Sequence, residues 1–121
     1  MAERTARQKD GDFGETLAAA HLSRHGYDCV AYNYHSRGGE IDIVAQNARY
    51  LLFVEVKTRR QGAMVSPAEA VSAAKQRKLL VTAEAYLVAH PTTLQPRFDV
   101  VCVELTPAGA CAGIQWIENA F

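Results

Sequence analysis

Two acidic residues and a lysine stand at a spacing that favours phosphodiester chemistry assisted by a metal ion. Glu55 follows Asp42 after twelve intervening residues, and Lys57 comes two residues later. Both segments alternate polar and apolar residues, which is typical of strands whose side chains point to alternate faces. Glu55 and Lys57 therefore share one face of a strand, and Glu40 and Asp42 share a face of the strand before it. Carboxylates beside an ammonium group indicate a metal-dependent nuclease site.

A hairpin would bring the two carboxylates together. A loop with an even number of residues, either 48–49 or 47–50, pairs residues whose numbers add up to 97, as 42 and 55 do. The pair Ala48-Arg49 lacks the Gly and Asn that a type I′ turn favours, so the four-residue loop is preferred. Both loops predict that Asp42 lies directly opposite Glu55, whereas an odd loop would place them on opposite faces.

Facing carboxylates need compensation, because like charges directly opposite one another destabilise a sheet. A hard divalent cation supplies it, since Mg²⁺ is often held by one or two carboxylates, with water and phosphate completing its shell. The same register sets Glu40 opposite Lys57. An ordinary ion pair between strands is the alternative explanation for that second pair.

Length and composition are consistent with a small enzyme or binding module. The chain of 121 residues suits a single domain, residues 1–121, with a proper core. Three cysteines without metal-ligand spacing, a polar start and no apolar run of membrane-spanning length predict a cytoplasmic protein with reduced thiols and no membrane partner. Thirteen basic and thirteen acidic residues cancel, so net charge alone does not indicate nucleic acid. Basic residues do cluster at 57–60 and 75–78, where solvated faces are the simpler reading.

The elements alternate between helix and strand patterns. The first helix ends before Gly26, and Asp12 followed by Glu15 could cap its start. Strand 27–34, a turn at 36–39, a hairpin over 40–58 and a loop at 61–65 follow. A helix begins at Ser66, and a second possible cap at Ser72 predicts either a kink there or two consecutive helices, the later one running to about Ala89. Strand 98–105, a loop at 107–113 and a short edge strand at 114–117 complete the pattern. The expected fold is α/β, with a mixed sheet flanked by helices and a parallel crossover beside the hairpin.

Short motifs extend this interpretation along nearly the whole chain. The order of elements and the residues Glu15, Asp42, Glu55 and Lys57 resemble the restriction-endonuclease-like PD-(D/E)xK superfamily, including archaeal Holliday-junction resolvases. The motifs as a set resemble the bacterial YraN family, also called UPF0102. They are Gly14-Glu15, Gly39-Glu40-Ile41-Asp42, Phe53-Val54-Glu55-Val56-Lys57-Thr58-Arg59, Lys75-Gln76-Arg77 and Arg97-Phe98-Asp99. Ile41 stands where the superfamily has proline, which leaves the carboxylate of Asp42 available.

The resemblance implies a restriction-endonuclease-like core of a helix, a three-strand meander, a helix and a strand. It further implies hydrolysis of DNA, with branched or structured DNA among the expected substrates, and Mg²⁺ or Mn²⁺ held by Asp42, Glu55 and the carbonyl of Val56. Lys57 would orient the attacking water or neutralise charge on the phosphate, and Glu15 would reach in from the first helix. A homodimer is implied if the likeness to resolvases extends to assembly. Candidates for contacting the substrate are Glu40, Arg59, Lys75 and Gln76.

Each of these assignments has a simpler alternative. Capping would explain Glu15, and a solvated helix turn would explain Lys75 and Gln76. Arg97 and Asp99 alternate on one strand face and are interpreted as structural. The alternative function is a non-catalytic protein that binds nucleic acid or a protein partner and retains the nuclease fold.

Overall fold

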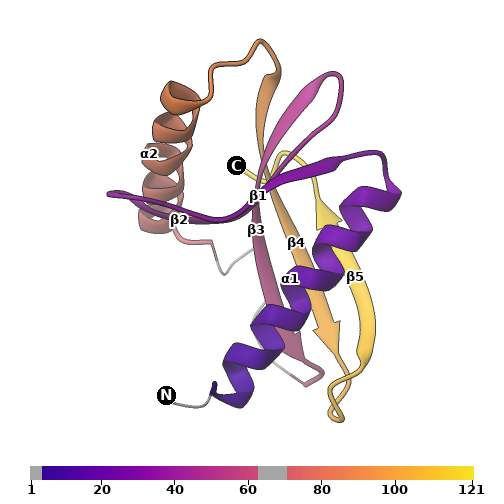
Figure 1. Cartoon of the computed structure of the whole chain (residues 1–121). Helices are drawn as coiled ribbons and strands as arrows, with labels where there is room; N and C mark the ends of the chain where they lie inside the picture. The colour runs from indigo at the N-terminus through magenta and orange to yellow at the C-terminus, as the bar shows by residue number, and fades with distance from the viewer. Residues whose placement is uncertain (1–3, 63–70) are drawn as a thin grey trace.

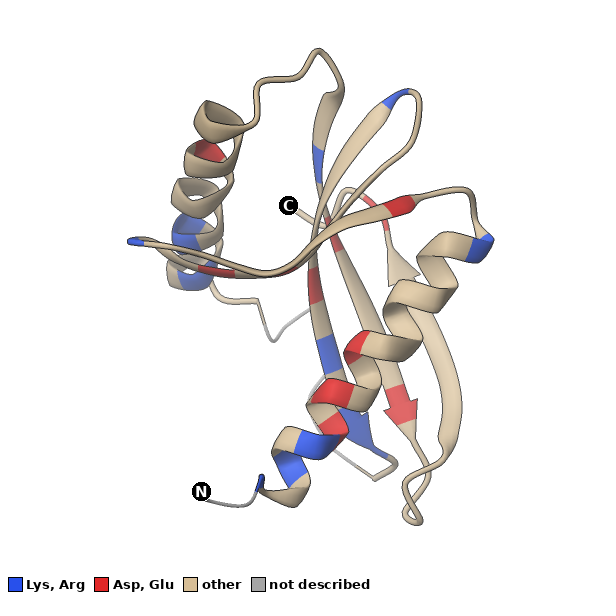
Figure 2. Ribbon diagram, in the orientation of Figure 1, with Lys and Arg blue, Asp and Glu red and all other residues tan. Residues whose placement is uncertain are grey.

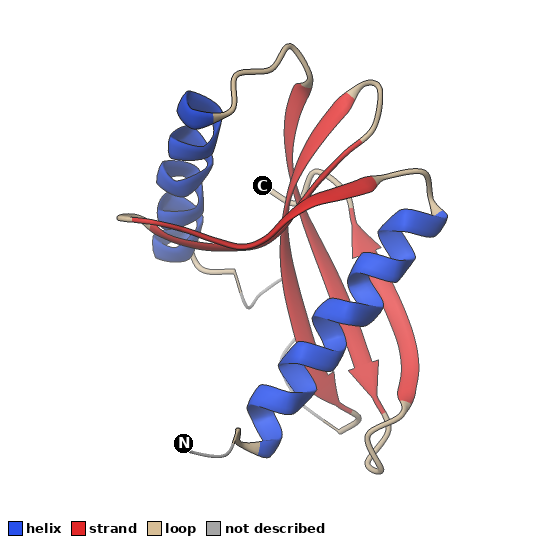
Figure 3. Cartoon of the chain, viewed as in Figure 1, coloured by secondary structure: helices blue, strands red, loops and turns tan. Residues whose placement is uncertain are grey.

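A five-stranded mixed sheet with one helix against each face makes up the computed structural model, which describes residues 4–62 and 71–121 (Figure 1). Figure 3 shows the two helices on opposite sides of the strands. The elements are α1 (Ala6–Arg24), β1 (Asp28–Ser36), β2 (Gly39–Gln46), β3 (Tyr50–Arg60), α2 (Ala73–Ala89), β4 (Gln95–Leu105) and β5 (Cys111–Ile117).

The strands lie in the order β1-β2-β3-β4-β5. All neighbours are antiparallel except β3 and β4, which run parallel and are joined through α2. The predicted α/β class, with its meander, crossover and mixed sheet, is therefore confirmed. It is consistent with a restriction-endonuclease-like core.

Alternation along β3 supplies the sheet with two hydrophobic cores. Leu52 and Val54 pack on the α1 side, and Leu51 and Phe53 pack on the α2 side. Both faces of this central strand are covered, so its first half reads as a continuous apolar run. The charged residues begin at Glu55, where the strand leaves the two cores.

Helix α1 begins earlier than the sequence analysis predicted. Thr5 is the N-cap and forms a capping box with Gln8, so the expected cap pair of Asp12 and Glu15 is wrong. The Thr5 hydroxyl accepts the Gln8 N–H at 3.1 Å, and the Gln8 side chain accepts the Thr5 N–H at 2.8 Å. Because capping is completed at Thr5, Glu15 lies in the helix interior with its carboxylate available for other contacts.

Gly14 lets α1 approach β3 closely, which explains a glycine inside a helix. A Cβ at this position would lie 1.8 Å from Thr58 Oγ1 and 2.9 Å from Thr58 Cβ, whereas a Cβ at Gly11 would meet nothing within 4 Å. We expect Gly14→Ala to lower the free energy of unfolding by roughly 1–3 kcal/mol through overpacking. Gly11→Ala should raise it by about 0.5–1 kcal/mol through helix propensity. Urea denaturation of the two variants measures both; equal stabilisation by the two alanines would contradict the close approach.

Helix α2 follows the second of the two predicted starts. Ser72 is the N-cap, its hydroxyl accepts the Lys75 N–H at 3.2 Å, and the helix ends at Ala89 as predicted. The alternative start at Ser66 lies outside the described residues. The edge strand β5 is longer than predicted because it begins at Cys111.

Asp99 ties the end of the sheet together. It is fully buried, and Arg97 donates to both of its oxygens at 2.9 Å. The Trp116 indole N–H donates at 2.8 Å and the Asn119 backbone N–H at 2.9 Å. These contacts support the structural interpretation of Arg97 and Asp99, because each charged or polar group here finds its partner inside the network.

Candidate active site

The predicted register of the β2–β3 hairpin is confirmed. The ladder runs from Ile43 opposite Val54 to Gln46 opposite Leu51, so the paired numbers add up to 97. Residues 47–50 form the loop, closed by the Asn47 N–H donating to the Tyr50 carbonyl at 3.1 Å. The predicted pair of Asp42 and Glu55 would be the next step of this register, but the ladder ends before it, and the two carboxylates interact electrostatically without being a strand pair.

Strand β2 leaves β3 at this point, since Ile43 and Val54 are the last pair of the ladder. Asp42 closes the resulting fork by accepting the Val56 N–H at 2.8 Å through Oδ2. The N–H and carbonyl of one strand residue project to the same edge, so the Val56 carbonyl also faces the fork. Two carboxylates and one peptide edge therefore converge where the sheet opens.

The predicted pair of Glu40 and Lys57 is wrong because of the same fork. Glu40 stays with the β1 partner and lies opposite His35, with 3.5 Å between Glu40 Oε1 and His35 Nε2. Lys57 instead lies 3.4 Å from Glu55 on its own strand. Glu55 and Lys57 thus share a strand face, as alternation predicted.

Glu55 is nearly buried, with 5% of its surface exposed, and two ammonium groups contact it. Lys75 reaches across from the first turn of α2 and donates a short hydrogen bond to Glu55 Oε1. Burial alone lowers the pKa of Lys75, but the hydrogen bond and the attraction of Glu55 outweigh it, so that the pKa is raised. Lys75 therefore remains in its protonated, positively charged form beside the Glu55 carboxylate.

Burial is the main reason that the pKa of Asp42 rises from 3.8 to about 7. The negative charges of Glu55 and Glu15 raise it further, while the Val56 hydrogen bond and Lys75 oppose the rise. A carboxyl group held this way takes up a proton readily near neutrality. The site consequently has more negative charge than its own lysines neutralise.

Glu15 enters the same centre from α1. Burial raises the pKa of Glu15, and the charge of Glu40 adds to the rise, while hydrogen bonds with Asn33 and Asp42 favour the charged form. Four side chains from four elements, those of Glu15, Asp42, Glu55 and Lys75, are therefore close together. Figure 2 shows how acidic and basic positions gather along β3 and the first half of α1.

Two clefts reach the carboxylates from different sides, and both include Asp42 and Glu55. The cleft on the α1 side has a volume of about 530 Å³ and also contains Glu15, Lys57 and the basic residues Arg7, Arg59 and Arg60. The cleft on the α2 side has a volume of about 380 Å³ and contains Glu40, Lys75 and Lys78. The centre is therefore nearly buried at Glu55 yet open to a ligand.

The remaining substrate-contact candidates divide into two groups. Arg59 lines the α1-side cleft and lies 3.5 Å from Glu104. Gln76 lines neither of the two clefts, and its amide donates to the Val71 carbonyl at 3.1 Å, ahead of α2. The structure therefore brings Glu40, Arg59 and Lys75 to the centre or its clefts, and uses Gln76 to hold the chain that enters α2.

Sequence reasoning missed Asn33, which contacts Glu15 and Glu40. Asn33 lies within the predicted strand 27–34, and no site role was predicted for it. Asn is depleted in strands, so an Asn inside the run 27–34 was the available signal.

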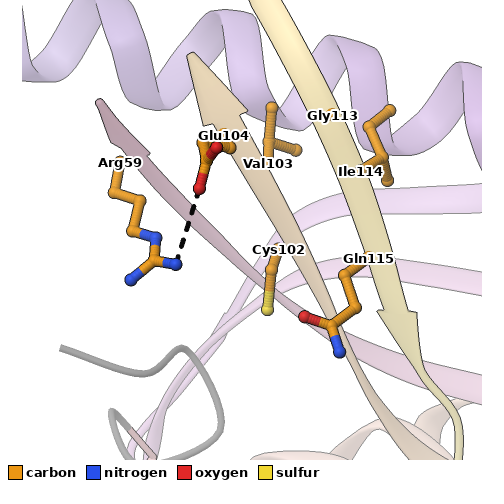
Figure 4. A pocket seen from close by; sticks show the side chains of 7 residues that line it. All are labelled: Arg59, Cys102, Val103, Glu104, Gly113, Ile114 and Gln115. Carbon is orange, nitrogen blue, oxygen red and sulfur yellow. Dashed lines mark ion pairs between the residues drawn. The ribbon is translucent and has the colours of Figure 1, made fainter. Parts of the chain in front are cut away.

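A separate hollow of about 230 Å³ lies on the α2-facing side of β3, β4 and β5 (Figure 4). Arg59 and Glu104 form an ion pair at its rim, and Cys102 lies at its base, where burial raises the pKa of the thiol. None of the carboxylates of the candidate site lines it. It is a distinct feature of the sheet.

Within residues 4–62 and 71–121, no three His, Cys, Asp or Glu side chains converge as a complete metal cage. The oxygen donors that do converge are the carboxylates of Asp42 and Glu55 and the edge of Val56, a set that suits a hard cation retaining water ligands. No helix in the described part of the chain has the length and apolar character needed to cross a membrane.

Fold and site together define an α/β protein whose mixed sheet is consistent with a restriction-endonuclease-like core and which has an acidic centre at a fork between two strands. The sequence profile of Uncharacterised protein family UPF0102 matches residues 14–103, which include every residue of that centre. The chain belongs to the UPF0102 family.

Similar proteins cover nearly the whole chain. A UPF0102 protein of Symbiobacterium thermophilum is 47% identical over 112 residues, covering 92% of this chain and 94% of the relative. One from Porphyromonas gingivalis is 43% identical over 111 residues, with 92% and 82% covered. One from Acinetobacter baumannii is 37% identical over 126 residues, with 94% and 95% covered.

Proposed function

We propose that this protein is a metal-dependent endonuclease that hydrolyses phosphodiester bonds in DNA, with branched or structured DNA as the preferred form. One observation carries the proposal: the carboxylates of Asp42 and Glu55, just beyond the last pair of the β2–β3 ladder, repel one another and line the same two clefts, with Lys57 on the strand of Glu55. Neighbouring carboxylates cost stability, so their presence is better explained by a ligand than by the fold.

The donor set fits Mg²⁺ or Mn²⁺. Asp42 and Glu55 would hold the ion, and the Val56 carbonyl faces the same fork. The raised pKa of Asp42 reflects its burial first and the negative charges of Glu55 and Glu15 second, and a bound cation would offset those charges. When bound, the ion supplies Lewis acidity that polarises a phosphate and makes a water ligand more acidic.

The chain's own cations and acids have separate roles in this proposal. Lys57 lies beside Glu55 with 27% of its side chain exposed, so it can contact a phosphate or a water in the cleft. Lys75 is hydrogen-bonded to Glu55, and its positive charge can attract a phosphate that enters the α2-side cleft. Glu15 adds a third carboxylate beside Asp42, where it would contribute negative charge to the site of a cation.

The substrate assignment to DNA is supported by the basic residues that line the clefts. Arg7, Arg59 and Arg60 lie on one side of the carboxylates, and Lys75 and Lys78 lie on the other. Phosphate contacts of this kind hold a nucleic acid irrespective of its sequence. The proposal includes a cytoplasmic homodimer, and analytical ultracentrifugation tests the oligomeric state.

Cleavage assays on linear, flapped, single-stranded and four-way DNA test the activity directly. We expect cleavage of a structured DNA with Mg²⁺ or Mn²⁺ and none with EDTA. Lys57→Ala should lower the rate by roughly 100- to 1000-fold, since it removes a charge aimed at the reacting phosphate. Arg24→Ala changes an exposed basic residue at the far end of α1 and should leave the rate unchanged. Cleavage that survives Lys57→Ala at the full rate would belong to a contaminant.

A non-catalytic function is the second candidate, and the contact of Lys75 with Glu55 favours it. An ammonium group on Glu55 supplies part of the neutralisation that a metal would provide. Such a protein would bind nucleic acid or a partner without turnover. Calorimetry with Mn²⁺ separates the two functions: absence of both cleavage and Mn²⁺ binding would leave only the non-catalytic one.

A further inference from the structure

Asn33 has an unusual backbone conformation at the centre of the molecule. Its φ is +50°, and among the described residues other than glycine only Asn119, at +52°, shares a positive φ. The left-handed region is costly for most residues but tolerated by Asn. Such conformations persist where surrounding structure holds them, and they cluster at functional sites. Asn33 therefore calls for an explanation beyond strand formation.

The register explains where this conformation places the side chain. Tyr32 lies opposite Ile43 and Tyr34 opposite Ile41, so Asn33 occupies the position across from Asp42. Asn33 and Asp42 themselves do not pair in this ladder. The irregular backbone thus lies directly beside the candidate site, on the strand that flanks β2.

The side-chain amide contacts two carboxylates at once. With its nitrogen turned toward them, Asn33 donates to Glu40 Oε1 at 3.0 Å and to Glu15 Oε1 at 3.2 Å. A primary amide carries two N–H donors, which matches two acceptors. The carboxylates of Glu15 and Glu40 repel one another, and the amide lies between them as a shared donor.

We infer that Asn33 is a positioning residue that holds the Glu15 carboxylate beside Asp42 and so prepares the acidic centre for a divalent cation. This inference rests on the proposed function. Asn33 acts through Glu15, since its contacts are to Glu15 and Glu40 and not to the two proposed ligands of the ion. An aspartate at this position would have no donor when ionised and would add a third negative charge.

Asn33→Gly isolates the amide, because glycine adopts positive φ without strain. Mn²⁺ calorimetry on the purified protein should show about 10-fold weaker binding, as is typical when a partner of a ligand shell is lost. The matched control is Asn119→Gly, which makes the same change at a left-handed position outside the site. It should leave Mn²⁺ affinity within twofold of the parent value. A merely structural asparagine would affect unfolding and leave the affinity unchanged.

A double-mutant cycle with Asn33→Gly and Glu15→Gln, in which unfolding is measured without metal, provides a second test. If the amide holds Glu15, the effects of the two changes on the unfolding equilibrium constant should differ from additivity by more than about threefold.

Where the parent protein binds Mn²⁺, equal affinity in Asn33→Gly overturns the inference. Where the parent protein binds no Mn²⁺, the proposed metal site fails, and the double-mutant cycle alone tests the role of Asn33. Coupling between Asn33→Gly and Glu15→Gln then supports the inference that Asn33 holds Glu15, and additive effects overturn it.

Discussion

Asp42→Asn is expected to abolish Mn²⁺ binding while making the metal-free protein more stable above neutral pH. The change removes one of the two opposed carboxylates but retains an oxygen that can accept the Val56 N–H. Binding of an ion to the folded state raises its stability. Thermal unfolding with and without Mn²⁺ should therefore show a rise for the parent protein and none for the variant.

The pH dependence of this effect follows from the raised pKa of Asp42, about 7 in the folded protein against 3.8 ordinarily. Between these values the folded protein binds a proton that the unfolded chain has released. The stabilisation is complete below about pH 4 and is lost as the pH rises through 7. Each pKa unit corresponds to about 1.4 kcal/mol. The free energy of unfolding of Asp42→Asn, relative to that of the parent protein, should therefore rise by roughly 2–4 kcal/mol across this window.

Asp28→Asn is the matched control, because Asp28 is exposed at the start of β1 and lines neither cleft. Urea denaturation from pH 4 to pH 8 gives the required curves. A stability difference between Asp42→Asn and the parent that stays constant over that range would show that Asp42 titrates normally. Mn²⁺-dependent stabilisation of Asp42→Asn would remove Asp42 from the ligand set.

Asp99→Ala is expected to produce the largest loss of stability in the molecule. It leaves the Arg97 guanidinium, which is 13% exposed, without the carboxylate that accepts two of its hydrogen bonds. The Trp116 and Asn119 donors lose the same acceptor. Breaking a buried pair on one side costs about 3–5 kcal/mol, a large fraction of the 5–15 kcal/mol that is typical of a domain.

Glu118→Ala provides the comparison, since Glu118 lies 3.7 Å from the same Arg97 with 59% of its side chain exposed. Exposed ion pairs contribute about 0–1 kcal/mol. The urea midpoint of Glu118→Ala should therefore stay close to that of the parent protein. Similar midpoints for the two variants would mean that the Asp99 network adds little to stability.

The features that sequence could predict are those set by short-range periodicity. The even loop predicted the hairpin register that pairs Ile43 with Val54, and alternation predicted that Glu55 and Lys57 share a strand face. The cap at Ser72 was predictable for a similar reason, because the hydroxyl and the Lys75 N–H that donates to it lie within one helical turn.

The features that sequence did not predict depend on distant contacts. A glycine inside a helix is unfavourable on propensity alone, and the reason for Gly14 is its close approach to Thr58 on β3. The fork after Ile43 arises because β2 stays with β1, which no pattern within the hairpin reveals. Asn33 acquires its role only when Glu15 of α1 and Glu40 of β2 are brought together around it. The residues of the candidate site could thus be named from their types, while the residues that arrange them required the structure.

The fork between β2 and β3 also bears on how a polymer could be threaded through the protein. Because one cleft approaches Asp42 and Glu55 from the α1 side and the other from the α2 side, the carboxylates do not lie at the bottom of a closed pocket. A closed pocket admits only the terminus of a chain. In the proposed nuclease, clefts on two sides of the carboxylates would let a strand continue in both directions from the bond held at the centre, so cleavage would not require a free terminus.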